Sequence, residues 1–182
     1  MKPNPSRPLA TQRGFSLIEI LITLVITAFG LIGLAGFVTK ASTLSADAAQ
    51  RARAAALLTD MAARIASNKA AAADYVTAAA LGEAEDDDCA GAATLAARDL
   101  CEWNNLLVGT QDANAAGNAA QLGFRGCVTQ PVALDPVFVV TVAWGSLSPG
   151  VPPADLCAQD EFGDESLRRV VRTLVRVADL DA

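Results

Sequence analysis

The most prominent feature of the sequence is a nearly unbroken run of apolar residues at positions 15–38, in which Glu19 is the only charged side chain. At a rise of 1.5 Å per residue, a helix of about 24 residues spans roughly 36 Å. This length exceeds the hydrocarbon core of a bilayer, which is about 30 Å thick. The run therefore predicts one membrane-spanning helix.

The helical pattern continues beyond the apolar run without a stop signal. Residues 39–68 are rich in alanine, leucine and arginine, which favour helix, and their apolar positions form an amphipathic stripe. The stripe consists of two heptad series, Leu44, Leu58 and Ile65, and Ala48, Ala55 and Ala62. We predict one helix from about Ser16 to about Ala66, whose second half packs on a globular head. A free coiled coil is the alternative, although Arg51 and the many alanines make a weak seam.

One further helical pattern follows in the head. The apolar residues of 95–107 lie on one helical face that carries Trp103, and Gly109 is a suitable helix stop. The small and polar residues at 110–121 indicate a loop.

The C-terminal third of the chain favours strands. Residues 124–130 and 137–144 are rich in β-branched and aromatic side chains and predict two strands that can form a hairpin. Residues 167–177 fit a helix or a strand, and their valines favour a strand. The predicted fold class is α+β, with a long N-terminal helix packed on a small antiparallel sheet.

Composition and charge exclude several classes of function. The chain has 182 residues, a formal net charge of −6 and no histidine. The negative charge argues against nucleic-acid binding, which requires a basic surface. The lack of histidine excludes Ser-His and Cys-His catalytic arrangements and most zinc sites. We therefore expect a structural or interaction protein, with no enzymatic activity, cofactor or metal.

The acidic segment at 83–88 is a candidate for calcium binding. Its carboxylates do not follow the alternating ligand pattern of an EF-hand, and the turn glycine of that motif is missing. We interpret the segment as a solvated acidic loop and assign it no role.

The residues before the apolar run give its orientation. They include Lys2, Arg7 and Arg13 and no acidic side chain, so the positive-inside rule places the N-terminus in the cytoplasm. A cleaved secretory signal does not fit, because the apolar core is too long and no clear A-x-A site follows it. A plain membrane anchor fits the length but leaves Glu19 unexplained, since a carboxylate in the membrane is unfavourable.

A third interpretation explains the whole N-terminal string. The sequence RGFSLIE at 13–19 resembles the signal of type IV pilins and pseudopilins, in which a basic leader ends in glycine before phenylalanine and an apolar helix with a glutamate. The resemblance implies that a prepilin peptidase cuts between Gly14 and Phe15 and methylates the amine of Phe15. It also implies that Glu19 pairs with the N-terminal amine of a neighbouring subunit and sets the register of assembly.

The same resemblance implies a domain organisation and the type IV pilin fold. Residues 1–14 would form a cleaved cytoplasmic leader, and 15–38 the transmembrane part of the helix. Residues 39–68 would form its amphipathic part, and 69–182 a periplasmic head with a C-terminal antiparallel sheet. The protein would lie in the inner membrane as a single-pass subunit.

Later motifs narrow the resemblance to the PilV family of minor pilins, the type IV pilus modification proteins. They are DLCEWNNLL at 99–107, GCV at 126–128, VTVAW at 140–144 and RRVV at 168–171. This implies partners in a prepilin peptidase, other minor pilins, the major pilin and the inner-membrane assembly platform. The implied function is priming of pilus assembly, with a place at the pilus tip where an adhesin is presented.

Two alternatives from other classes stay open. A minor pseudopilin of a type II secretion system would share the leader, Glu19 and the helix. A membrane-anchored binding module or hydrolase would have no role in a filament, and no nucleophile-elbow motif or catalytic base supports it.

The four cysteines follow the membrane span, on the oxidising side of the membrane, which indicates disulfides. Three connectivities are possible. We favour Cys89–Cys101, which would join the acidic loop to the short helix, and Cys127–Cys157, which would join a strand to the last long loop. Each would stabilise the small head by roughly 2–4 kcal/mol.

Overall fold

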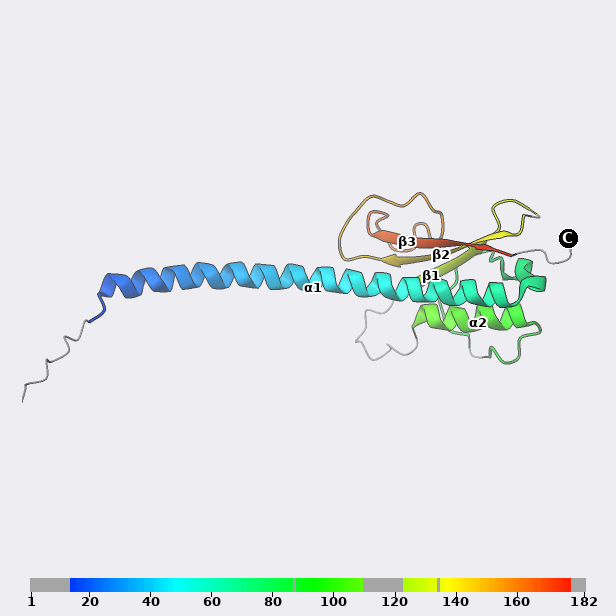
Figure 1. The fold of residues 1–182 in the computed structure, drawn as a ribbon, viewed down its shortest axis with the longest axis horizontal. Coiled ribbons are helices and arrows are strands. Elements are labelled where there is room, and N and C mark those ends of the chain that lie inside the picture. The colour runs from blue at the N-terminus through cyan, green and yellow to red at the C-terminus, as the bar shows by residue number, and fades with distance from the viewer. Residues whose placement is uncertain (1–13, 87, 110–122, 134, 178–182) are drawn as a thin grey trace, which may run out of the picture. The chain divides into compact units, whose positions relative to one another are not determined.

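The computed structural model describes residues 14–86, 88–109, 123–133 and 135–177. The leader residues Lys2, Arg7 and Arg13 and the expected loop at 110–121 lie outside the described residues. The elements in chain order are α1 (Leu17–Ser67), the 3-10 helix η1 (Lys69–Tyr75), α2 (Leu95–Val108), β1 (Phe124–Thr129), β2 (Val137–Gly145) and β3 (Arg168–Arg176) (Figure 1).

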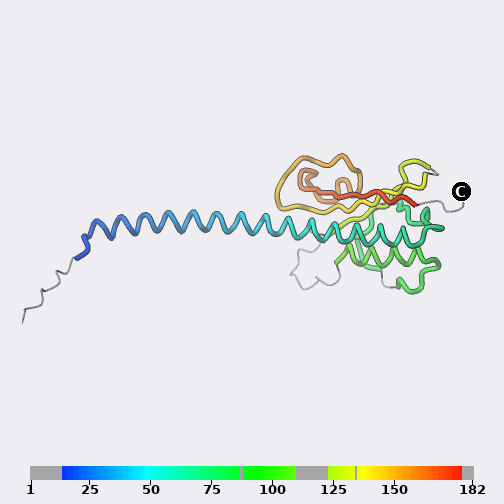
Figure 2. Tube along the Cα trace, viewed as in Figure 1, coloured from blue at the N-terminus to red at the C-terminus, as the bar shows by residue number. Residues whose placement is uncertain are grey.

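The chain divides into two compact units, Met1–Thr43 and Leu44–Ala182, and α1 extends through both. In the first unit α1 is a continuous helix, which Figure 2 traces without a break. Every residue of this unit from 17 to 42 is exposed. Because this stretch has no buried face, packing within its own unit does not stabilise it.

The second unit is built on a three-stranded antiparallel sheet with the order β1-β2-β3. In its register Phe124 of β1 lies opposite Trp144 of β2, and Val137 of β2 lies opposite Arg176 of β3. Residues 168–176 are therefore a strand, as the valines of this segment favoured. The predicted α+β class, with a long helix on a small antiparallel sheet, is confirmed.

The inner face of the sheet packs on the part of α1 that belongs to this unit (Figure 1). The buried residues of this helix are Ala54, Leu57, Met61 and Ile65. The predicted stripe was partly wrong, because Leu44, Ala48 and Ala55 are exposed while Leu58 and Ala62 are half-buried. The alanines on every side of α1 leave its buried face undetermined in the sequence, and contacts with α2 and the sheet select it.

Helix α2 is fixed by its caps and by one tryptophan. Thr94 caps the N-terminus by accepting a hydrogen bond from the Ala97 amide (3.1 Å), and Gly109 ends the helix in the left-handed conformation with φ of 77°. The buried Trp103 donates from Nε1 to the Leu57 carbonyl of α1 (2.9 Å). A side chain at Gly126 of β1 would collide with the Trp103 ring, so a glycine is needed where α2 meets the sheet.

Candidate processing and assembly site

The chain has no regular secondary structure and is exposed at the predicted cleavage position. Gly14, Phe15 and Ser16 precede the first turn of α1, and the surroundings of Gly14 are empty within 4 Å of where a Cβ would lie. The Phe15 side chain is 80% exposed. The bond between Gly14 and Phe15 therefore lies in an accessible backbone segment, as a peptidase substrate requires.

Helix α1 begins immediately after this segment. The Ser16 carbonyl accepts hydrogen bonds from the amides of Glu19 (3.0 Å) and Ile20 (3.3 Å). Glu19 thus lies in the first turn, where the positive end of the helix dipole favours a carboxylate. Ser16 and Glu19 have the spacing of a capping box, but neither side chain makes the reciprocal hydrogen bond of that motif in the described residues.

Glu19 is unlike the other polar side chains of the apolar stretch. Thr23 donates its hydroxyl to the Ile20 carbonyl (2.8 Å), and Thr27 donates to the Thr23 carbonyl (2.7 Å). Both threonines are thus satisfied within the helix, as a lipid environment demands. In the described stretch 17–38, Glu19 alone has a polar side chain without a hydrogen-bond or ion-pair partner. No group among the described residues of the chain serves as its partner.

The surface around Glu19 is apolar. Leu17, Ile18 and Ile22 are 81%, 65% and 51% exposed, respectively. Within the part of the chain that the structure describes, α1 is the one helix long and apolar enough to cross a membrane. Exposed apolar surface on this scale calls for lipid or for other helices.

The predicted site residues fall into two groups. Gly14, Phe15 and Glu19 lie together at the start of α1, whereas the four cysteines lie in the second unit. There, Cys89 is bonded to Cys101 and Cys127 to Cys157, with Cα–Cα separations of 5.4 and 5.9 Å. These are the two pairs favoured from the sequence, and they leave no free cysteine.

An ionic network that the sequence did not reveal joins α1, η1 and α2. The Arg64 guanidinium binds three carboxylates, those of Asp60 (2.9 Å), Asp99 (2.9 Å) and Glu102 (2.7 Å). Burial alone would lower the pKa of Arg64, but its hydrogen bonds to these carboxylates raise the pKa above the ordinary value. Burial and a hydrogen bond to Asp99 (2.5 Å) raise the pKa of Tyr75. The spacing of Asp60 and Arg64 at i and i+4 is compatible with an ion pair within α1, but nothing in the sequence indicates the contacts of Arg64 with α2.

A second unforeseen feature is the buried Arg168, which is 1% exposed. Its Nε lies 3.0 and 2.8 Å from the two Glu165 oxygens, and its Nη1 donates to the carbonyls of Asp155 (2.8 Å) and Cys157 (3.0 Å). The hydrogen bond from Arg168, together with one from the Asp160 amide, lowers the pKa of Glu165. Arg168 thus anchors the loop before β3 to the sheet.

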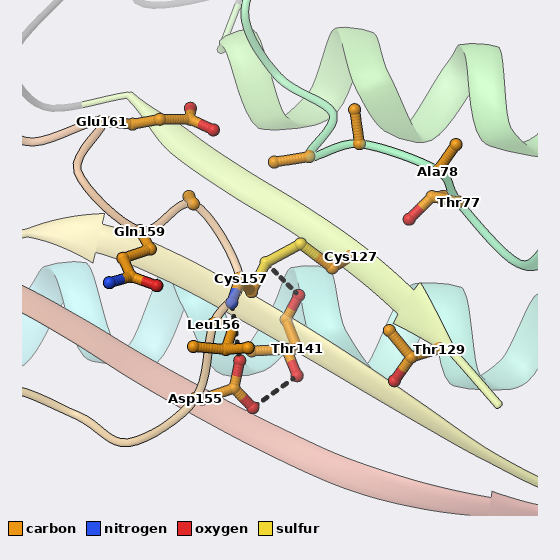
Figure 3. Close-up of a pocket in the computed structure, with 13 residues that line it drawn as sticks. Thr77, Ala78, Cys127, Thr129, Thr141, Asp155, Leu156, Cys157, Gln159 and Glu161 are labelled. Atoms are coloured by element: carbon orange, nitrogen blue, oxygen red, sulfur yellow. Dashed lines mark hydrogen bonds between the residues drawn. A yellow bond between two sulfur atoms is a disulfide. The ribbon is translucent and has the colours of Figure 1, made fainter. Parts of the chain in front are cut away.

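A groove of about 520 Å³ lies beside the second disulfide on the outer face of the sheet (Figure 3). Its carboxylates already have partners. Asp155 accepts from Thr141 Oγ1 (3.3 Å) and from the Cys157 amide (2.9 Å), while Glu161 accepts from Arg125 Nε (2.7 Å). In the described residues no group of three or more carboxylates or cysteines could hold a metal ion. The groove's acidic groups thus maintain local structure.

Comparison with known proteins bears on the start of α1. Residues 9–35 match the model of the prokaryotic N-terminal methylation motif. No curated protein and no solved structure matches the chain. The matched segment contains Gly14, Phe15 and Glu19 and most of the exposed apolar surface. The chain therefore carries an N-terminal methylation motif of the type IV pilin-like class on a helix suited to a single-pass membrane anchor.

Proposed function

We propose that this protein is a minor pilin of a type IV pilus that helps to prime pilus assembly. One observation carries the proposal: within the methylation motif, Glu19 is the one polar side chain of the apolar stretch 17–38 without a partner. A carboxylate in hydrocarbon is strongly unfavourable alone and much less so beside a positive charge. The N-terminal amine of a neighbouring subunit is a partner of the right charge and depth.

The proposed maturation follows from the residues at the start of α1. A prepilin peptidase on the cytoplasmic face would cut between Gly14 and Phe15 and methylate the new amine. Gly14 suits such a site because it has no side chain and leaves the backbone approachable. Methylation keeps the positive charge that Glu19 of the next subunit would bind.

The proposed role is nucleation. The apolar part of α1 would leave the lipid and pack against the corresponding helices of other minor pilins, so that a first turn of subunits forms in the inner membrane. The major pilin would then add to that turn through the assembly platform. The head, held in the periplasm, would reach the pilus tip or enter the shaft, and at the tip it would help present an adhesin.

The resemblance to the PilV family over the head motifs favours a minor pilin. The alternative is a minor pseudopilin of a type II secretion system, which would use the same motif, Glu19 and helix. Purification of the subunit from its native membrane with its bound minor subunits separates the two. Pilus subunits in the eluate support the proposal, and secretion-system pseudopilins contradict it.

The role of Glu19 is tested by Glu19→Val as the sole copy of the subunit. We expect the variant to be cleaved and inserted normally but to lose priming, seen as loss of surface pili by electron microscopy. Thr23→Val is the matched control, because it also removes a polar side chain from the helix but one that α1 satisfies internally. Wild-type piliation with Glu19→Val would contradict the proposed role.

A further inference from the structure

The two edges of the sheet differ in whether another segment of the described chain pairs with them. Beyond β1, the segment before α2 covers the edge, since the Thr77 amide donates to Val128 (2.9 Å) and Leu81 and Gly126 exchange two backbone hydrogen bonds (2.8 and 2.9 Å). Beyond β3, no described segment of the chain pairs with the sheet. This edge is nine residues long. An open edge of that length is able to accept another strand.

The hydrogen bonds that flank β3 show which backbone groups face outward. The Ser146 amide donates to Leu167 (2.8 Å), and the Val177 amide donates to Pro136 (2.8 Å). The direction of N–H and C=O groups alternates along a strand, so the odd-numbered residues from 167 to 177 face β2. The even-numbered residues of β3 therefore direct their N–H and C=O groups away from the sheet.

Four consecutive even-numbered residues present these outward groups, Val170, Arg172, Leu174 and Arg176. No hydrogen bond from the described chain reaches their outward backbone groups, whereas the Arg168 amide already donates to Glu165 (3.2 Å). Leu174 is 70% exposed, and the Arg172 side chain is 71% exposed, with only a 4.0 Å ion pair to Asp155. The edge thus combines free backbone groups, an exposed leucine and two arginines.

We propose that the outer edge of β3 binds an extended acidic strand of a partner protein, which extends the sheet by one strand. The partner strand would place carboxylates opposite Arg172 and Arg176 and an apolar side chain opposite Leu174. Backbone hydrogen bonds would supply the affinity. The two ion pairs and the apolar contact would supply the specificity.

A second copy of this chain is a poor occupant of the edge. Pairing of two β3 strands would gather Arg172 and Arg176 from each copy on one face, and like charges across strands are unfavourable. The arginines therefore discourage self-association and select for acidic residues two positions either side of an apolar one. Binding at this edge involves the head alone and does not require cleavage of the leader.

The test is binding of synthetic peptides to the full chain in detergent micelles at physiological ionic strength. The probe is a peptide of alternating threonine and valine, as long as β3, with two glutamates spaced like Arg172 and Arg176. A peptide with lysines at those two positions is the control. We expect the glutamate peptide to bind at least about tenfold more tightly, because two favourable pairs replace two repulsive ones. Equal affinities would overturn the proposal, as would no binding of the glutamate peptide.

Two substitutions locate the site. Leu174→Pro removes one outward N–H without removing a hydrogen bond to β2, and Leu174→Ala is the matched control that keeps this N–H. We expect the proline variant to lose peptide binding and the alanine variant to retain most of it. In the double variant R172E/R176E the preference should reverse in favour of the lysine peptide. An unchanged affinity of Leu174→Pro, or an unchanged preference of the double variant, would contradict the edge as the binding site.

Hydrogen exchange of the wild-type chain gives a measurement that does not depend on the folding of a variant. Without peptide, the amides of Arg172 and Leu174 should exchange quickly, whereas those of Val171 and Thr173, which face β2, should be protected. Saturating glutamate peptide should slow the outward amides selectively. If bound peptide leaves their exchange unchanged, the peptide binds elsewhere and the proposal is wrong.

Discussion

Gly14 and Glu19 lie close together in the chain but carry different parts of the proposed maturation. Gly14 would act only in recognition by the peptidase, because no described atom lies within 4 Å of where its Cβ would be. Glu19 would act only in assembly, because it lies inside the helix and beyond the bond that we propose is cut. Substitutions at the two positions should therefore separate processing from assembly.

Replacement of Gly14 should affect cleavage and leave folding intact. We expect Gly14→Asp to remain uncleaved, since a charged side chain at the scissile bond cannot enter a tight site at the membrane surface. Gly14→Ala, with one added methyl group, is the matched control and should be cleaved in part. The cleaved fraction is measured by mass spectrometry after co-expression with a prepilin peptidase. Maturation of Gly14→Asp to the wild-type extent would show that the assigned bond is wrong.

Glu165 should give the head a pH-dependent stability. Its pKa in the folded state lies below the ordinary value of 4.5, so its stabilising effect is complete above about pH 4.5 and is lost as the pH falls through the folded pKa. Glu165→Gln should therefore lower the urea midpoint at about pH 7, and the difference from wild type should shrink at about pH 3. Glu83→Gln, at an exposed carboxyl without a described partner, should leave the midpoint unchanged at both pH values. A constant difference for Glu165→Gln would contradict the proposed cause.

Among the elements, α2 and the loop before β3 each depend on a disulfide. Cys89–Cys101 closes a sequence separation of 12 residues and ties the acidic loop to α2, whereas Cys127–Cys157 closes 30 residues and ties β1 to the loop anchored by Arg168. Each disulfide should stabilise the head by about 3 kcal/mol. Because Cys127–Cys157 closes the longer loop, the chain-entropy model makes its stabilisation larger than that of Cys89–Cys101 by about 0.8 kcal/mol.

This ordering is tested by replacing each pair with serines, C89S/C101S and C127S/C157S, and measuring urea unfolding of the full chain in detergent. We expect both variants to unfold at lower urea than wild type, with C127S/C157S the less stable. Equal stability of wild type and both variants would show that the two links do not hold the head together.

The elements also show what the sequence could and could not predict. The strands were identified from their β-branched residues, and the end of α2 from Gly109, because these signals are local. The buried face of α1 was assigned partly to the wrong residues, since alanine is compatible with either face and Trp103 of α2 decides which one is covered. Nothing local to Arg168 in the sequence indicates that it is buried, because its burial depends on a loop from earlier in the chain.

The residues at and just before the start of α1 were the most predictable part of the candidate site. Gly14, Phe15 and Glu19 fall within six residues of the chain, and the matched methylation motif covers all three. The free edge of β3 was not foreseen, because it depends on strand order and on which segments cover each edge. Residue patterns predict which segments form strands. They do not predict the order of the strands, because this order arises from contacts between distant segments.

For the whole molecule, the two units divide the proposed function. The first presents an exposed apolar helix with one unpartnered carboxylate, which suits lipid before assembly and neighbouring helices afterwards. The second has its own core, two disulfides and a sheet edge that no described segment covers, which suit contacts outside the membrane. These properties support the proposal that the chain functions by assembling with partners.

The central claim is that the protein matures as a type IV pilin-like subunit, and its intact mass tests this most directly. The full chain is co-expressed with a prepilin peptidase, and its mass is compared with that of the chain expressed alone. We predict the loss of residues 1–14 and the gain of one methyl group on Phe15. An unchanged mass, under conditions that mature a known pilin, would contradict the claim and leave an ordinary membrane-anchored protein.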